Sequence, residues 1–137
     1  MAAARSAWTS QAAFVRRFAM SGGLLATGTG FEWKGYPVPG AGIHRELSAL
    51  VRAGLTPAEA IRAATLGGAD VIGAVAGPGV GRIATGADAS FLLVTGDPLV
   101  RIEDLEHLSA VIRGGEVLEP ATLVSRIRRG TSGAVPK

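Results

Sequence analysis

Apolar residues recur with helical spacing near the start of the chain. Gln11 completes an apolar stripe, whereas Arg16 and Arg17 fall on the opposite side of the same helical projection. The pattern predicts a helix over residues 10–20, ended by the glycine pair that follows. The members of the stripe are Phe14, Val15 and Phe18.

A short apolar run follows this helix. Residues 24–27 have glycines on both sides, which is typical of a short buried strand. Residues 28–42 are rich in glycine, proline and aromatic residues and predict a loop. A second helix follows, with Leu47, Leu50 and Val51 on one face.

Gly54 provides the left-handed residue that ends this second helix. The next residues, Thr56-Pro57-Ala58-Glu59, form a capping-box motif with proline at the first helical position. We therefore expect a third helix to about residue 66, with three inward side chains. These are Ile61, Ala64 and Thr65.

The second half of the chain has the pattern of short strands. Gly114 and Gly115 lie between two of them, as in a tight hairpin in which both turn residues have positive φ. A final helix is expected over residues 121–127, after Pro120. The expected strands are residues 82–83, 90–94, 108–113 and 116–119.

Composition narrows the class of protein. The chain has 137 residues, fewer than the roughly 250 of a complete eight-stranded α/β barrel. Its residues are 47% hydrophobic and 18% charged, and the mean hydropathy is +0.32. Such an apolar composition predicts that part of the surface is covered by a partner.

Charge and residue usage exclude several partners. The net charge of +3 comes largely from arginines beside a Gly/Ser/Pro-rich tail, which is typical of a solvated terminus. Aromatic residues make up only 5%, too few for base-stacking platforms, so no nucleic-acid partner is expected. No stretch approaches the roughly 20 apolar residues of a membrane span, and no membrane partner is expected. The absence of cysteine excludes thiolate sites and favours a cytoplasmic location.

Four segments occur in an order and spacing that resemble a known family: residues 44–66, 81–86, 91–94 and 110–117. The chain is similar, over about residues 8–119, to the C-terminal part of metal-dependent amidohydrolases, especially imidazolonepropionase-like and prolidase-like members. The resemblance implies a mixed α+β fold: the last β/α unit of a TIM-type barrel plus part of a small β-sandwich domain. The implied division is residues 1–73, residues 74–127 and a flexible tail over residues 128–137.

The resemblance implies metal-dependent hydrolysis of amide or cyclic-amide C–N bonds, with zinc or another divalent metal in the intact family. Members usually have Gly-Thr-Asp at the end of the last barrel strand, where the aspartate binds metal; this chain has Gly28-Thr29-Gly30. It also has Ala89-Ser90 where the family has Ala-Asp before a strand, a position we interpret as structural. The other family ligands lie on earlier strands. We therefore predict no catalytic residue, metal ligand or cofactor in this chain, which we interpret as an incomplete and inactive fragment.

Four residues are candidates for a substrate loop: Thr29, Gly30, Lys34 and His44. They follow the C-terminal end of the expected strand, where barrel enzymes place their sites. A helix-start histidine held by the local backbone is the alternative for His44. A small-molecule amide would be the substrate only if the barrel is completed. The competing hypothesis is a non-catalytic module that forms homo-oligomers or complements another chain, because the strand over residues 24–27 would otherwise be unpaired.

Overall fold

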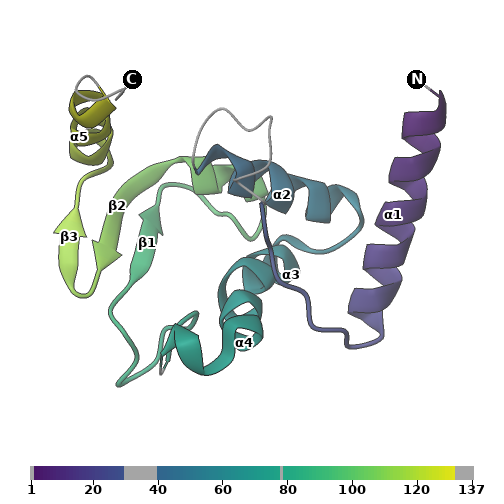
Figure 1. Cartoon of the computed structure of the whole chain (residues 1–137), viewed down its shortest axis with the longest axis horizontal. Helices are drawn as coiled ribbons and strands as arrows, with labels where there is room; N and C mark the ends of the chain where they lie inside the picture. The colour runs from purple at the N-terminus through teal and green to yellow at the C-terminus, as the bar shows by residue number, and fades with distance from the viewer. Residues whose placement is uncertain (1, 30–39, 78, 132–137) are drawn as a thin grey trace, which may run out of the picture.

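The computed structural model describes residues 2–29, 40–77 and 79–131, and within them it has mixed helix and sheet content (Figure 1). The helices are α1 (Ala2–Met20), α2 (Ala41–Arg52), α3 (Pro57–Arg62), α4 (Gly68–Ile72) and α5 (Pro120–Thr131). The strands are β1 (Phe91–Val94), β2 (Leu108–Arg113) and β3 (Glu116–Leu118). A π-helical turn (Ala63–Gly67) joins α3 to α4, and 3₁₀ turns cover Gly73–Ala76 and Ile102–Glu106.

Helix α1 is longer than the apolar stripe predicted. It begins at Ala2 rather than Ser10, because the preceding residues are rich in alanine, the residue with the highest helix propensity. The expected end at the glycine pair is confirmed. Gly22 adopts a φ of 81°, and the amide of Gly23 donates to the carbonyl of Phe18 over 2.9 Å.

The expected buried strand over residues 24–27 is wrong. No described strand lies beside this segment, and the amide of Thr27 donates to the helical carbonyl of Ala63 over 3.3 Å instead. Leu24 is 53% exposed. A β-ladder requires a second strand to receive its backbone hydrogen bonds, and here the neighbouring element is a helix.

The capping box is confirmed. The hydroxyl of Thr56 accepts from the amide of Glu59 over 3.2 Å, and the Glu59 carboxylate accepts from the amide of Thr56 over 2.7 Å. The Thr56 amide, followed by the Thr56 hydroxyl, which donates to the same carboxylate oxygen over 2.8 Å, lowers the pKa of Glu59. The helical path continues beyond residue 66 through the π-helical turn into α4. The inward placement of Thr65 is wrong: the residue is exposed, and its hydroxyl donates to the carbonyl of Ile61 within the same helix.

The core joins elements from both halves of the sequence. Leu47 of α2, Ala60 of α3 and Ile102 of the 3₁₀ turn are buried against one another. The partly buried side chains packed around them are Ile43, Leu50, Val51, Ile61, Ala64 and Leu105. This cluster fixes α2, whose other faces carry the candidate site.

The sheet has the order β1-β2-β3 with antiparallel pairing, and the expected hairpin is confirmed. Gly114 and Gly115 have φ values of 57° and 84°, so both turn positions favour glycine. The hydroxyl of Ser90 accepts from the amide of Gly114 over 3.0 Å, which is a structural role. The expected strand over residues 82–83 is wrong, since these residues lie in an irregular segment and Ile83 is 88% exposed.

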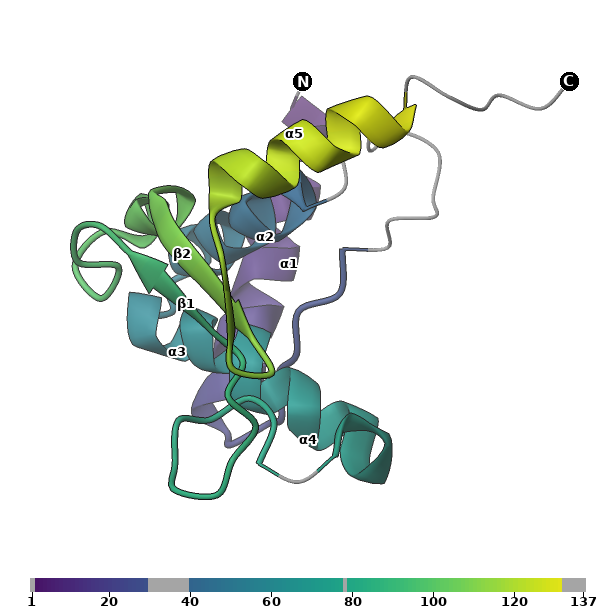
Figure 2. The same ribbon diagram turned by 90° about the vertical axis from the view of Figure 1, so that its left-hand side faces the viewer.

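The elements spread along one long axis. Helix α1 stands at one end, and the sheet with α5 occupies the other, with α2 between them (Figure 1). Figure 2 looks along this axis, with the sheet and α5 toward the viewer. The expected final helix is confirmed and extends to Thr131. Among the described residues, no helix combines the length and apolarity needed to cross a bilayer.

Candidate functional site

The candidate site lies where the segment over residues 23–29 passes between helices α2 and α3. Two hydrogen bonds hold this segment. The amide of Thr27 donates to the Ala63 carbonyl at the end of α3, and the amide of Gly28 donates to Oε1 of Glu46 on α2 over 2.9 Å. The chain is therefore tethered on both sides just before Thr29.

Two glycines permit this close approach. A Cβ atom on Gly67 would lie 2.1 Å from the carbonyl oxygen of Leu25, and a Cβ atom on Gly42 would lie 3.1 Å from Cβ of Thr29. Gly67 belongs to the π-helical turn, and Gly42 is buried in the first turn of α2. The absence of side chains at these two positions sets where residues 25–29 run.

A cavity of about 350 Å³ opens beside Thr29. It is lined by Gly28, Thr29, Gly42, Arg45, Glu46, Ala49 and Arg52. Of the candidate residues, Thr29 is in this lining. His44 is half-buried on α2 and is not among the lining residues. Gly30 and Lys34 lie outside the described residues.

Glu46 was not anticipated as a site residue, because it shares the polar side of its helix with Arg45 and Arg52. Its Oε1 holds Gly28, and its Oε2 is buried with no hydrogen-bond partner among the described residues. A buried carboxylate oxygen without a donor is costly, so this oxygen is an available acceptor. No local sequence signal marks Glu46, since its importance comes from a segment 18 residues away.

The described residues do not fit a catalytic zinc. No group of three or more His, Cys, Asp or Glu side chains gathers anywhere in the described part of the chain. A catalytic zinc takes three protein ligands, whereas the cavity beside Thr29 offers the single carboxylate of Glu46.

A second charged cluster lies beyond β1 and is structural. Asp104 is 5% exposed, and its carboxylate accepts from the amide of Asp97 over 2.9 Å and from Nε of Arg101 over 2.6 Å. His107 approaches the same carboxylate at 3.8 Å from its Nδ1. The Asp97 hydrogen bond, followed by that of Arg101, lowers the pKa of Asp104. The cluster fixes the 3₁₀ turn that places Ile102 in the core.

Comparisons with known proteins show which family and which proteins this chain is similar to. A sequence model described as the amidohydrolase family matches residues 40–120. An imidazolonepropionase from Anaeromyxobacter sp. (strain K) is 42% identical over 82 residues, covering 58% of this chain and 19% of that protein. A crystal structure titled amidohydrolase eaj56179 aligns with a TM-score of 0.44 and 25% identity, covering 77% of this chain and 36% of its own. The chain thus spans about a fifth of the curated relative and about a third of the solved one.

Proposed function

The chain belongs to the amidohydrolase family, and from that premise we propose that it is the closing segment of a metal-dependent enzyme that hydrolyses amide or cyclic-amide C–N bonds. The similarity to an imidazolonepropionase supports this class of reaction. In this proposal the chain contributes the segment over residues 23–29 and its flanking helices to the end of a TIM-type barrel, and its sheet to the small β-sandwich domain. The substrate is a small-molecule amide, bound only when the barrel is complete.

The observation that carries the proposal is the tethered segment that ends at Thr29. Glu46 holds this segment, and the glycines at positions 42 and 67 let it lie close against the helices, as expected of a chain that delivers a residue to a site. The next residue is Gly30, at the position where the family pattern has a metal-binding aspartate. Glycine has no side chain to bind a metal or to accept the proton of an attacking water. We therefore propose that the chain supplies scaffold and cavity and does not catalyse alone.

Segment exchange in the curated relative tests this role. We expect the Anaeromyxobacter imidazolonepropionase to keep its turnover within about tenfold when residues 40–120 of this chain replace its aligned segment. A longer exchange that begins at residue 23 also introduces Gly30 and should abolish turnover. Gly30→Asp in the longer chimera should restore it, because the carboxylate returns. Steady-state kinetics on the three purified chimeras, with their zinc content, is the measurement.

The isolated chain is the control for the exchange. We expect it to retain no stoichiometric zinc after dialysis and to hydrolyse no member of an amide and cyclic-amide panel. Zinc near one per chain, together with turnover that is lost on chelation, would show that the chain is an enzyme by itself. A folded short chimera without activity would contradict the scaffold role.

A non-catalytic module that forms homo-oligomers or complements another chain is the second candidate. It is favoured by β1, which lies at an edge of the sheet and exposes Phe91, Leu92 and Leu93. An edge strand of this composition is a template for pairing with another strand. Light scattering coupled to size-exclusion chromatography should then give a mass above the 13.9 kDa of one chain. A stable monomer at micromolar concentration would refute self-association.

A further inference from the structure

One turn of α2 contacts both Gly28 and Thr29. Gly42 and Glu46 are four residues apart on this helix, so they lie one above the other on the same face. Oε1 of Glu46 accepts from the amide of Gly28 over 2.9 Å. A Cβ atom on Gly42 would lie 3.1 Å from Cβ and 3.2 Å from Cγ2 of Thr29. The same face of α2 therefore holds the backbone of one residue and receives the side chain of the next.

The hydrogen bond to Glu46 is the stronger of the two that hold this segment. The amide of Thr27 donates to the neutral carbonyl of Ala63 over 3.3 Å, whereas the amide of Gly28 donates to a carboxylate over 2.9 Å. Hydrogen bonds to a charged acceptor are shorter and roughly twice as strong as neutral ones. The two donors are consecutive amides whose acceptors lie on different helical elements. Rotation of the segment about its own axis would therefore break at least one of the two bonds.

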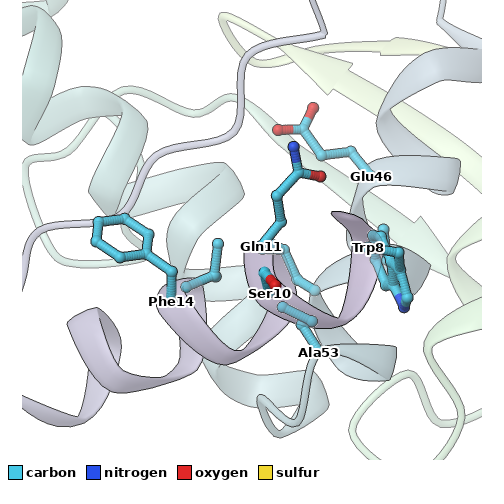
Figure 3. A pocket seen from close by; sticks show the side chains of 10 residues that line it. Trp8, Ser10, Gln11, Phe14, Glu46 and Ala53 are labelled. Carbon is cyan, nitrogen blue, oxygen red and sulfur yellow. The ribbon is translucent and has the colours of Figure 1, made fainter. Parts of the chain in front are cut away.

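The carboxylate of Glu46 is enclosed. Its Oε2 is buried and has no hydrogen-bond partner among the residues that the structure describes. Figure 3 shows the carboxylate pointing away from its own helix, with the side-chain amide of Gln11 on α1 directed toward it. Burying an oxygen without a donor is costly, and an apolar side chain of similar size would avoid that cost. A contribution to stability alone therefore does not account for a glutamate here, whereas a need to hold the Gly28 amide does.

We propose that Glu46 is a positioning residue that, together with Gly42, fixes where Thr29 lies at the edge of the cavity. The carboxylate holds the backbone one residue before Thr29, and the missing side chain of Gly42 leaves room for the threonine. The role of Glu46 in turnover rests on the proposed function, because Thr29 reaches a substrate only in the completed barrel. The placing of Thr29 is a property of this chain itself.

Hydrogen exchange of the intact chain, followed by NMR, tests the hold on the backbone. Glu46→Ala should accelerate exchange of the Gly28 amide by at least about tenfold, because the acceptor is lost. Glu46→Gln keeps an acceptor oxygen at the same reach and should hold that rate within about threefold. The amide of Ala60, which donates to the carbonyl of Thr56 at the start of α3, is the internal reference. Its rate should stay within about threefold in every variant.

Gly42→Ala tests the second contact of the same face. The new methyl group would lie closer to Thr29 than most real Cβ contacts do, so the threonine must shift by a few tenths of an ångström. We expect the Thr29 methyl resonance to move while the exchange rate of the Gly28 amide stays within about threefold. Glu116→Ala, at an exposed position on β3, is the control and should change neither signal.

Turnover of the longer chimera that carries Gly30→Asp tests the role in catalysis. Adding Glu46→Ala should lower kcat by about tenfold and leave KM within about twofold, because misplacing a group in the site costs rate more than binding. Adding Glu46→Gln instead should keep kcat within about threefold, since the acceptor oxygen remains. Glu116→Ala should leave both constants unchanged.

A loss of local selectivity would overturn the positioning role. In the intact chain, that result is equal acceleration of the Gly28 and Ala60 amides in Glu46→Ala, or no acceleration of Gly28. In the chimera, an unchanged kcat or a raised KM alone would exclude Glu46 from turnover, while the activity of the chimera would still support the proposed function. A chimera that is inactive before any change at Glu46 would instead contradict the proposed function, and the exchange rates of the intact chain would then decide the positioning role.

Discussion

Gly67→Ala is expected to destabilise the chain by about 1–3 kcal/mol, although alanine is the better helix former. Gly67 has helical dihedral angles, φ −59° and ψ −44°, so its backbone does not require glycine. The new methyl group would lie 2.1 Å from the carbonyl oxygen of Leu25, an approach that real Cβ atoms do not make. The segment over residues 23–29 must then move away from the π-helical turn. Chemical denaturation followed by circular dichroism measures the loss.

Gly68→Ala is the matched control for this substitution. Gly68 has nearly the same dihedral angles, φ −59° and ψ −46°, but its new methyl group would find its nearest neighbour, the carbonyl oxygen of Ala63, at 4.0 Å. The ordinary helix preference for alanine then applies, and stability should rise by up to about 1 kcal/mol. Opposite signs at adjacent glycines are the expected result. Equal effects at both positions would mean that residue 25 does not pack on the π-helical turn.

Asp104→Asn is expected to lower the melting temperature by several degrees at neutral pH. The substitution removes a buried negative charge that accepts from the Asp97 amide and from the Arg101 guanidinium. The two donors reach different carboxylate oxygens, Oδ2 and Oδ1, and asparagine replaces one of these oxygens with an NH2 group, so one donor loses its acceptor. The turn that carries Ile102 into the core loosens as a result. Asp88→Asn, at an exposed position, is the control and should melt like the unmodified chain.

The same substitution should change the response to acid. The pKa of Asp104 is lowered in the folded chain, first by the Asp97 hydrogen bond and then by that of Arg101. Its contribution to stability is therefore fully present above the unfolded pKa, near 4, and is lost as the pH falls through the folded pKa. Thermal melts from pH 7 down to pH 2 should show a steeper decline for the unmodified chain than for Asp104→Asn. Parallel curves would contradict the assignment of this carboxylate.

Local signals predicted the local structures well. The capping box at Thr56 and the Gly114-Gly115 turn both involve atoms a few residues apart, so the sequence contains all the partners that these motifs need. The helical stripe of α2 is similarly confirmed. The start of α1 was wrong because the apolar stripe begins later than the alanine-rich residues that also favour helix. The predicted strand over residues 24–27 was wrong because a strand needs a neighbouring strand to pair with, and no local pattern specifies that neighbour.

The candidate site depended on contacts between distant parts of the chain. The order and spacing of segments along the chain identified the family, because each segment forms a helix or strand that its own residues indicate. The hydrogen bond of Glu46 to Gly28, the contact of Gly67 with Leu25 and the burial of Asp104 join residues through packing. Nothing in the spacing of a glutamate on a polar helix face distinguishes a tether from a solvated charge. The sequence alone therefore determined α2, the capped start of α3, the final helix, the hairpin and the family, whereas tertiary packing decided which polar residues are buried and where residues 23–29 run.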